Sequence, residues 1–323
     1  MSRLTHVTSG PFAPPAATRE LTVVSADGAR LHAEVHGPDG APAIVLAHGW
    51  TCSTAFWAAQ IRDLAVDHRV IAYDQRGHGR SVAPDGVEGY STTALADDLE
   101  AVLAATLEPG EQAVLAGHSM GGMTIMAAST RPVFREHAAA VLLCSTGSSR
   151  LVAESLVVPM RAGRLRTRIT RSVLGAKAPL GPVTPLARKI LKYATMGPGS
   201  APDRVDVCAH IVHGCPRVVR YRWSHVLDEI ELDAGVLELN VPTAVIAGTV
   251  DRMTPVTHAR RLAGMLPDSL GLTELPGLGH MTPVEAPEAV TGGIRDLVQR
   301  YVRVDGQQVH GLEGLEGLEG SSA

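Results

Sequence analysis

The run Ala113–Gly122 constrains the fold more than any other part of the chain. Four apolar residues lead directly into Gly117-His118-Ser119-Met120-Gly121, and Met120–Ala128 continue with a helical pattern. A strand that turns this sharply into a helix holds the residue at the turn in strained backbone angles. The glycines beside it have no Cβ and let the two segments pass close together. The sequence therefore predicts a strand, a sharp turn at Ser119 and a helix.

The same turn has a chemical consequence. It would push the Ser119 hydroxyl out at the end of a strand. It would also point the N-terminus of the next helix at that hydroxyl, where backbone N–H groups can hold an oxyanion. A Gly-x-Ser-x-Gly pattern also occurs in plain turns of glycine-rich chains, but the strand before it and the helix after it favour a nucleophile here.

Strand and helix patterns alternate along most of the chain. Strands are expected at residues 21–25, 30–36, 43–47, 69–73, 113–116, 138–143, 243–248 and 270–275. Helices are expected at residues 54–65, 92–107, 120–128, 256–266 and 287–302. Apolar strands separated by helices indicate a mostly parallel sheet that is covered on both faces. We therefore predict an α/β fold with about eight strands.

The alternation is interrupted in the middle of the chain, where no strand pattern is visible and basic residues gather. We expect a flexible lead-in over residues 1–18, an α/β core over 19–148 and 236–305, a helical cap inserted over 149–235, and a disordered tail over 306–323. The tail repeats Gly-Leu-Glu three times, and such a segment has no periodic apolar face to bury.

Composition excludes several classes of protein. The formal net charge of −4 argues against a nucleic-acid-binding surface, so we expect no nucleic-acid partner. The four cysteines are too few and too scattered for a disulfide framework. No apolar run approaches the roughly 18 residues of a spanning helix, and no signal-peptide run opens the chain. We therefore expect a cytoplasmic protein without stable membrane insertion.

A serine becomes a strong nucleophile only when a base takes its proton, and the base needs an acid to orient it. His280 follows a predicted strand through a glycine-containing loop, and Asp251 follows the strand before it. We therefore predict a catalytic group of Ser119, Asp251 and His280. The oxyanion would be held by the N–H group of Met120 and by that of Trp50, which follows an earlier strand.

Five motifs in chain order resemble the α/β-hydrolase superfamily over roughly residues 20–303. They are His48-Gly49-Trp50, Asp74-Gln75-Arg76-Gly77-His78-Gly79-Arg80-Ser81, Gly117–Gly122, Gly248-x-x-Asp251 and Gly279-His280. The third resembles the turn of esterases and monoacylglycerol lipases. The resemblance implies the α/β-hydrolase fold, a triad in the chain order Ser-Asp-His, and a cap between the sixth and seventh strands. Related epoxide hydrolases and haloalkane dehalogenases carry an Asp nucleophile, so Ser119 argues against both activities.

We therefore expect a serine hydrolase of the esterase or lipase type, which cleaves a carboxylic ester through an acyl-enzyme and without a cofactor. Its partner would be a small, apolar ester. The same triad could instead serve C–C bond hydrolysis, lactone or thioester hydrolysis, perhydrolysis or acyl transfer, because this fold hosts many reactions. A ligand-binding protein without turnover is a more distant alternative.

Several other residues have both a functional and a structural interpretation. Candidates for the substrate pocket are His48, Gly49, Trp50, Met120, Met123, Trp223 and Met281. Met and Trp are also ordinary core residues, and His48 can equally be a packed, hydrogen-bonded histidine. His118 is interpreted as a buried spacer and Asp98 as a solvent-facing residue. Asp74 and Arg76 are expected to anchor their loop.

Two clusters in the predicted cap also have alternative interpretations. Cys208, His210, His213 and Cys215 suggest a metal site, but their spacing matches no common zinc pattern, so no metal is expected. The basic run Arg161–Arg171 can be a solvated face, a weak contact with an anionic lipid surface, or a means of attracting an acidic substrate.

Overall fold

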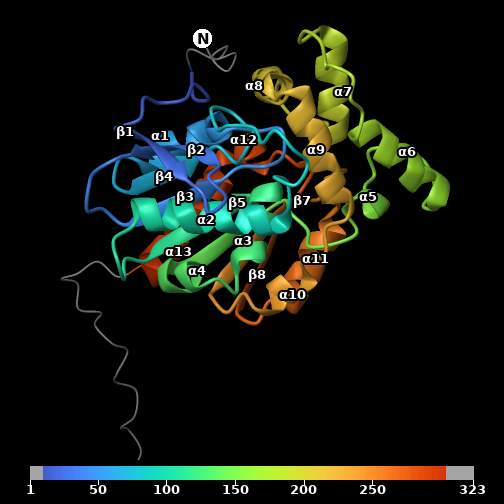
Figure 1. Cartoon of the computed structure of the whole chain (residues 1–323). Helices are drawn as coiled ribbons and strands as arrows, with labels where there is room; N and C mark the ends of the chain where they lie inside the picture. Colours follow the sequence, from blue (N-terminus) through green and yellow to red (C-terminus); the bar gives the residue numbers. More distant parts are fainter. Residues whose placement is uncertain (1–9, 303–323) are drawn as a thin grey trace, which may run out of the picture.

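The computed structural model describes residues 10–302, which form a central sheet, helices on both of its faces and a helical insertion (Figure 1). The sheet has eight strands in the order β1-β2-β4-β3-β5-β6-β7-β8. Their bounds are β1 Arg19–Val24, β2 Arg30–His36, β3 Ala43–Ala47, β4 Arg69–Tyr73, β5 Ala113–His118, β6 Ala138–Cys144, β7 Thr243–Gly248 and β8 Ser269–Leu275. The pairs β1–β2 and β2–β4 are antiparallel, and the other pairs are parallel. The predicted fold class is confirmed.

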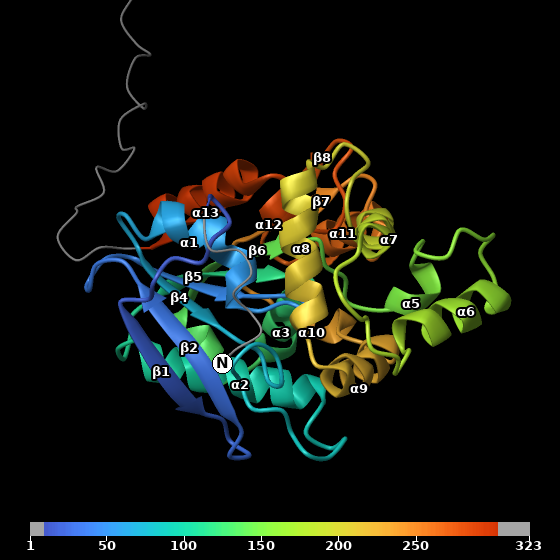
Figure 2. The same ribbon diagram turned by 90° about the horizontal axis from the view of Figure 1, so that it is seen from above.

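The helices outside the insertion divide between the two faces of the sheet (Figure 2). Their bounds are η1 Thr54–Trp57, α1 Ala58–Leu64, α2 Thr92–Thr106, α3 Met120–Ala128, α4 Pro132–His137, α11 Val256–Met265, α12 Thr282–Glu285 and α13 Pro287–Tyr301. Helices α1 and α13 lie together on one face, and α2 and α3 lie together on the other.

Strand β3 illustrates how the sequence builds an apolar core on each face. All five of its residues are buried. Val45 packs with apolar residues of α2 and α3, whereas Ile44 and Leu46 pack with those of α1 and α13. Successive side chains of a strand point to opposite faces, so a strand that is covered on both faces requires an unbroken apolar run. Burying each Val, Leu or Ile side chain contributes about 1.5–3 kcal/mol.

The insertion occupies the chain between β6 and β7 and contains six helices. Their bounds are α5 Leu151–Glu154, α6 Arg164–Leu174, α7 Pro185–Thr195, α8 Pro202–Gly214, α9 Arg217–Asp228 and α10 Asp233–Leu237. Helices α6 and α7 project away from the sheet on one side of the molecule (Figures 1 and 2). Among residues 10–302, no helix combines the length and the apolarity needed to cross a bilayer.

The N-terminal segment differs from its prediction where the structure describes it. Phe12 and Ala13 are buried, and Arg62 Nη2 donates to Ala13 O at 2.6 Å. Phe12 and Ala13 therefore anchor this segment to the body, where a flexible lead-in was expected, and burial of Phe12 contributes part of the free energy that orders the chain here. The remainder of the predicted lead-in, 1–9, and the predicted tail, 306–323, lie outside the described residues.

Candidate active site

The predicted sharp turn lies between β5 and α3. Ser119 has φ 50° and ψ −116°, outside the regions that L-residues usually occupy. Two hydrogen bonds hold it there: its N–H donates to Cys144 O at 2.9 Å, and Thr146 Oγ1 donates to its carbonyl oxygen at 2.7 Å. A Cβ on Gly121 would lie 2.0 Å from Ala47 O, so the helix can approach β3 only with glycine at this position.

The predicted base and acid lie together beyond the ends of β8 and β7. His280 Nδ1 donates to Asp251 Oδ2 at 2.8 Å, and both side chains are buried. The other carboxylate oxygen, Asp251 Oδ1, accepts from the N–H groups of Met253 and Thr254 at 2.8 and 3.0 Å. These contacts assign the ring proton to Nδ1 and leave Nε2 of His280 as an acceptor.

Ser119 and His280 line one cavity of about 310 Å³. Three of the predicted pocket residues, Trp50, Met123 and Met281, also line it. The insertion contributes most of the remaining wall, which includes Leu151, Val152, Leu174, Leu191, Val212 and Leu227. The wall is mostly apolar, although Ser155, His213, Arg220 and Ser224 of the insertion also line it.

The His48-Gly49-Trp50 loop lies against the turn, because a Cβ on Gly49 would be 3.1 Å from Ser119 Cβ. His48 is fully buried and does not line the cavity. Its Nε2 accepts from the Gln75 N–H at 3.0 Å, and its Nδ1 donates to Gly49 O at 2.8 Å. Burial lowers the pKa of His48 to about 3, so the ring is neutral. His48 and Gly49 thus fix the conformation of the loop and do not line the cavity, whereas the sequence predicted that both would contact substrate.

The two backbone groups predicted to hold an oxyanion belong to residues beside the turn. Met120 is the first residue of α3, so its N–H lies at the helix N-terminus next to Ser119. Its side chain is fully buried and does not line the cavity. Trp50 lines the cavity, and its indole Nε1 is tied to Arg220 O at 3.2 Å.

His118, interpreted from the sequence as a buried spacer, also contacts the base. Its Nε2 donates to His280 O at 2.8 Å, and the two ring centroids are 4.9 Å apart. Burial holds the pKa of His118 well below its usual value, so the ring next to Ser119 is neutral. His118 therefore links the turn to the loop that carries the base without adding a charge to the cavity.

The structure places two predicted residues elsewhere. Trp223 is fully buried and does not line the cavity; its Nε1 donates to Arg76 O at 3.2 Å and its ring packs edge-on against Tyr90. Asp98 is buried instead of solvent-facing, and it accepts from Arg76 Nε at 2.7 Å. Both residues support the loop that Arg76 anchors. Asp74, in the same loop, accepts from the N–H of Arg80 and from that of Thr54 at the start of η1.

Glu285 was not predicted from the sequence, yet it joins the base loop to the insertion. The carboxylate is buried and accepts from the N–H groups of Gly279 and Met281, on either side of His280. It also accepts from the Gly197 N–H at 2.7 Å and from Ser200 Oγ at 2.6 Å, both in the segment between α7 and α8. No local sequence pattern indicates this role, because the donors are up to 88 residues away.

Replacing Glu285 by Gln should disturb the base more than the pocket. An amide has one oxygen and turns its NH₂ toward N–H groups that need an acceptor, which leaves buried donors unpaired. We expect a loss of about 2 kcal/mol in the free energy of unfolding. A small displacement of His280 would also lower kcat by about 10- to 100-fold with a smaller change in KM. Urea unfolding and steady-state ester kinetics measure the two effects, and unchanged kcat would contradict the positioning role.

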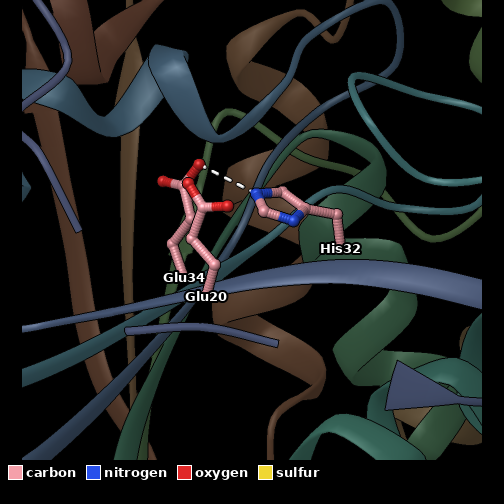
Figure 3. A group of neighbouring side chains, drawn as sticks. All are labelled: Glu20, His32 and Glu34. Atoms are coloured by element: carbon pink, nitrogen blue, oxygen red, sulfur yellow. Dashed lines mark hydrogen bonds and ion pairs between the residues drawn. The ribbon is translucent and has the colours of Figure 1, made fainter. Parts of the chain in front are cut away.

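The Cys and His residues of α8 are not brought together. Cys208 and Cys215 pack in different apolar cores, and His213 Nδ1 donates to Gly181 O at 3.0 Å. Within the described part of the chain, the group whose ligand atoms lie close enough to hold a cation is Glu20, His32 and Glu34 (Figure 3). Each of these three side chains already has an ion-pair partner within the protein.

The cluster of Figure 3 lies on the hairpin formed by β1 and β2. Glu20 and Glu34 are directly opposite each other, and Arg80 pairs with Glu20 at 2.6 Å. Glu34 accepts from His32 Nε2 at 3.0 Å and contacts His36 Nε2 at 3.4 Å. Burial disfavours ionised Glu34, but hydrogen bonds from the two histidines outweigh burial and lower its pKa to about 2.

This lowered pKa predicts how stability depends on pH. Glu34 has a lower pKa in the folded chain than its ordinary value of 4.5, so its contribution is complete above pH 4.5 and is lost as the pH falls toward 2. Glu34→Gln should therefore reduce the free energy of unfolding by about 1–2 kcal/mol at pH 7, and the difference should vanish near pH 2. Glu20→Gln, in the exposed pair, should cost less than about 1 kcal/mol. A difference that grows at low pH would contradict this assignment.

The class of protein follows from where the groups lie. A serine at a strained strand-to-helix turn, with an acid and a base beyond two later strands of the same parallel sheet, is the arrangement of an α/β-hydrolase. The chain belongs to the alpha/beta hydrolase family, whose sequence model matches residues 44–292. The protein is thus a hydrolase built on this fold.

Individual relatives have different named activities. RutD of Variovorax paradoxus, whose name assigns it carbamate hydrolysis, is 31% identical over 84% of this chain and 96% of its own. Epoxide hydrolase A of Mycobacterium tuberculosis is 26% identical over 85% of this chain and 96% of its own. The solved enol-lactonase of Burkholderia xenovorans superposes with a TM-score of 0.68 at 25% identity, over 87% of this chain and all of that one.

Proposed function

We propose that the protein is a serine hydrolase that cleaves a carboxylic ester through an acyl-enzyme. One observation carries this proposal: Ser119 lines the same apolar cavity as His280, and the Nδ1 proton of His280 is held by Asp251. That proton placement leaves Nε2 free to accept the hydroxyl proton of the serine. The serine in place of an Asp nucleophile separates this chain from the chemistry of epoxide hydrolases.

The reaction would proceed in two halves. Ser119 Oγ attacks the ester carbonyl while His280 Nε2 takes its proton, and the N–H groups of Trp50 and Met120 hold the oxyanion. His280 then gives the proton to the alcohol oxygen, and the C–O bond breaks to leave an acyl-enzyme. Water next loses a proton to His280 and attacks the acyl carbon. His280 then gives this proton to Ser119 Oγ as the bond between Oγ and the acyl carbon breaks, which releases the acid and restores the serine. Asp251 stabilises the imidazolium in both halves, and no cofactor enters any step.

The cavity supports an apolar substrate. Its walls beyond Ser119 are formed mainly by Leu, Val and Met side chains. We assign residues 149–235 the role of a cap over the core of 19–148 and 236–305, because helices of that segment complete the wall. An acyl or alcohol chain of several carbons would gain about 0.8 kcal/mol for each CH₂ that it buries there.

The test is hydrolysis of p-nitrophenyl esters from acetate to decanoate, followed by kcat/KM against chain length. We expect kcat/KM to rise with length until the chain fills the cavity and then to fall. Lactones and carbamates form the second set of substrates, since two relatives carry names with those activities. Turnover of lactones or carbamates alone would replace the ester proposal, and binding of an ester without any turnover would support a ligand-binding role.

A further inference from the structure

The insertion contains a strongly basic segment. Residues 150–192 contain ten of the 29 Lys and Arg residues and one of the 33 Asp and Glu residues, a formal charge of +9. Since the whole chain has a charge of −4, everything outside this segment sums to −13. The positive segment comprises α5, α6 and α7 and their connections, of which α6 and α7 project from the body (Figures 1 and 2).

Part of this charge has no counterion within the described chain. Arg171 pairs with Asp228 and Arg188 pairs with Asp206. In contrast, four exposed residues form no ion pair with any residue from 10 to 302: Arg161, Arg164, Arg168 and Lys189. Unpaired cations gathered on one projecting surface create a local positive potential that attracts anions.

The same surface exposes large apolar side chains. Leu165 is 62% exposed on α6, and Leu186 and Ile190 are 66% and 60% exposed on α7. Met160, Val173, Leu180 and Tyr193 are exposed in the same segment. A helix of a globular protein usually turns such residues toward its core, so their exposure beside cations is the pattern of a helix that lies on a lipid interface.

The cavity opens toward this surface. Val173, Leu180 and Ile190 are exposed, and all three also line the cavity that contains Ser119. A molecule that enters past them reaches the reacting end of the cavity through an apolar passage. Exposed apolar residues therefore line the outer part of the cavity, and the unpaired cations lie on the same segment of the chain, residues 161–189.

We propose that α6, α7 and the segment between them dock on an anionic lipid surface. The cations would bind lipid phosphates, and Leu165 and Leu186 would insert among the acyl chains. A lipid surface fits both properties, because it offers negative charge above an apolar interior. Docking would place the cavity entrance on the lipid, so that an apolar ester passes directly into the cavity; this last step rests on the proposed function.

Sedimentation with lipid vesicles tests the docking directly. We expect the protein to bind vesicles of phosphatidylcholine with about one third phosphatidylglycerol at least tenfold more tightly than vesicles of phosphatidylcholine alone. Raising the salt from about 50 to 500 mM should abolish this preference, since surface charges are screened. Equal binding to both vesicle types, or none to either, would overturn the proposal.

Two double variants separate the charge from the apolar contact. Arg164→Glu with Arg168→Glu, and Leu165→Asp with Leu186→Asp, should each weaken binding to anionic vesicles at least tenfold. None of these four residues lines the cavity, so hydrolysis of a short soluble ester should not change. Val24→Asp with Arg30→Glu, at exposed positions on the β1–β2 hairpin, is the matched control and should bind like the original chain.

The outcomes distinguish the two proposals. If the variants bind vesicles as well as the original chain does, the docking proposal fails, whatever the esterase result. If the original chain binds an acidic protein but not the vesicles, and the variants lose that binding, the surface belongs to a protein partner. This result would also overturn the docking proposal. Vesicle binding without ester turnover would leave the docking intact and remove the proposed function.

Discussion

Ser119→Ala is expected to lower kcat for ester hydrolysis by about 10⁶-fold, to the level that binding and oxyanion stabilisation alone provide. In the proposed mechanism Oγ is the atom that forms the acyl-enzyme, and Ser119 is the hydroxyl-bearing residue of the turn that lines the cavity with His280. Ala has no better access than Ser to φ 50°, so the backbone strain stays nearly the same. Burst and steady-state release of p-nitrophenol measure the effect.

Ser129→Ala is the matched control at the other end of α3. Its Oγ is buried, has no hydrogen-bond partner in the described chain and does not line the cavity. We expect kcat within about twofold of the original and a similar thermal unfolding midpoint for both variants. Equal turnover by Ser119→Ala and the original protein would show that another residue is the nucleophile.

Asp251→Asn has the second-largest expected effect, a loss of about 10⁴-fold in kcat. Asp251 Oδ1 accepts from two N–H groups, so the amide oxygen of Asn would take that place. The NH₂ group would then face His280 Nδ1 and require it to accept. The ring proton would move to Nε2, which could no longer take a proton from Ser119.

We expect this loss of kcat for Asp251 alone, because its carboxylate contacts the imidazole of His280. Asp268→Asn, at an exposed position before β8, removes the same charge from the surface and should leave kcat unchanged. Substrate binding should survive in Asp251→Asn, so KM should change much less than kcat. A loss below about tenfold would mean that His280 keeps its tautomer without Asp251, for example through Thr254, whose Oγ1 lies 3.2 Å from Nδ1.

The sequence predicts best where the signal is local. The bounds of β3, β4, β7 and α3 agree with their predictions. In each case the apolar run or the helical pattern begins and stops at the residues where the element begins and ends. The placement of Ser119, Asp251 and His280 on one edge of the sheet follows in turn, since Ser119 comes directly after β5 and the other two lie in the loops that follow β7 and β8. Chemistry placed at strand ends is thus accessible to sequence reasoning once the strands are known.

Features that depend on distant partners were missed. Trp223 and Asp98 looked like a pocket wall and a solvent-facing acid, but both lie against the buried Arg76 loop, 147 and 22 residues away. Glu285 escaped notice because its donors come from two separate loops. The burial of Phe12 was not predicted, because Phe12 lies in a proline-containing segment that has no periodic apolar pattern. In each case the missed role includes a tertiary contact, such as that between Gly197 and Glu285, whose two members do not lie in one short stretch of sequence.

The attachment of the base loop to the insertion has a kinetic consequence. Besides Glu285, the carbonyl of Thr195, at the end of α7, accepts from the N–H of His280 at 2.7 Å. We expect a movement of this end of α7 away from the core to move the imidazole as well, so the proposed catalytic group would be complete only while the insertion is closed. An open form would admit solvent yet be unable to activate it. In the proposed reaction, an acyl-enzyme in the open form would therefore be hydrolysed only after the insertion closes again.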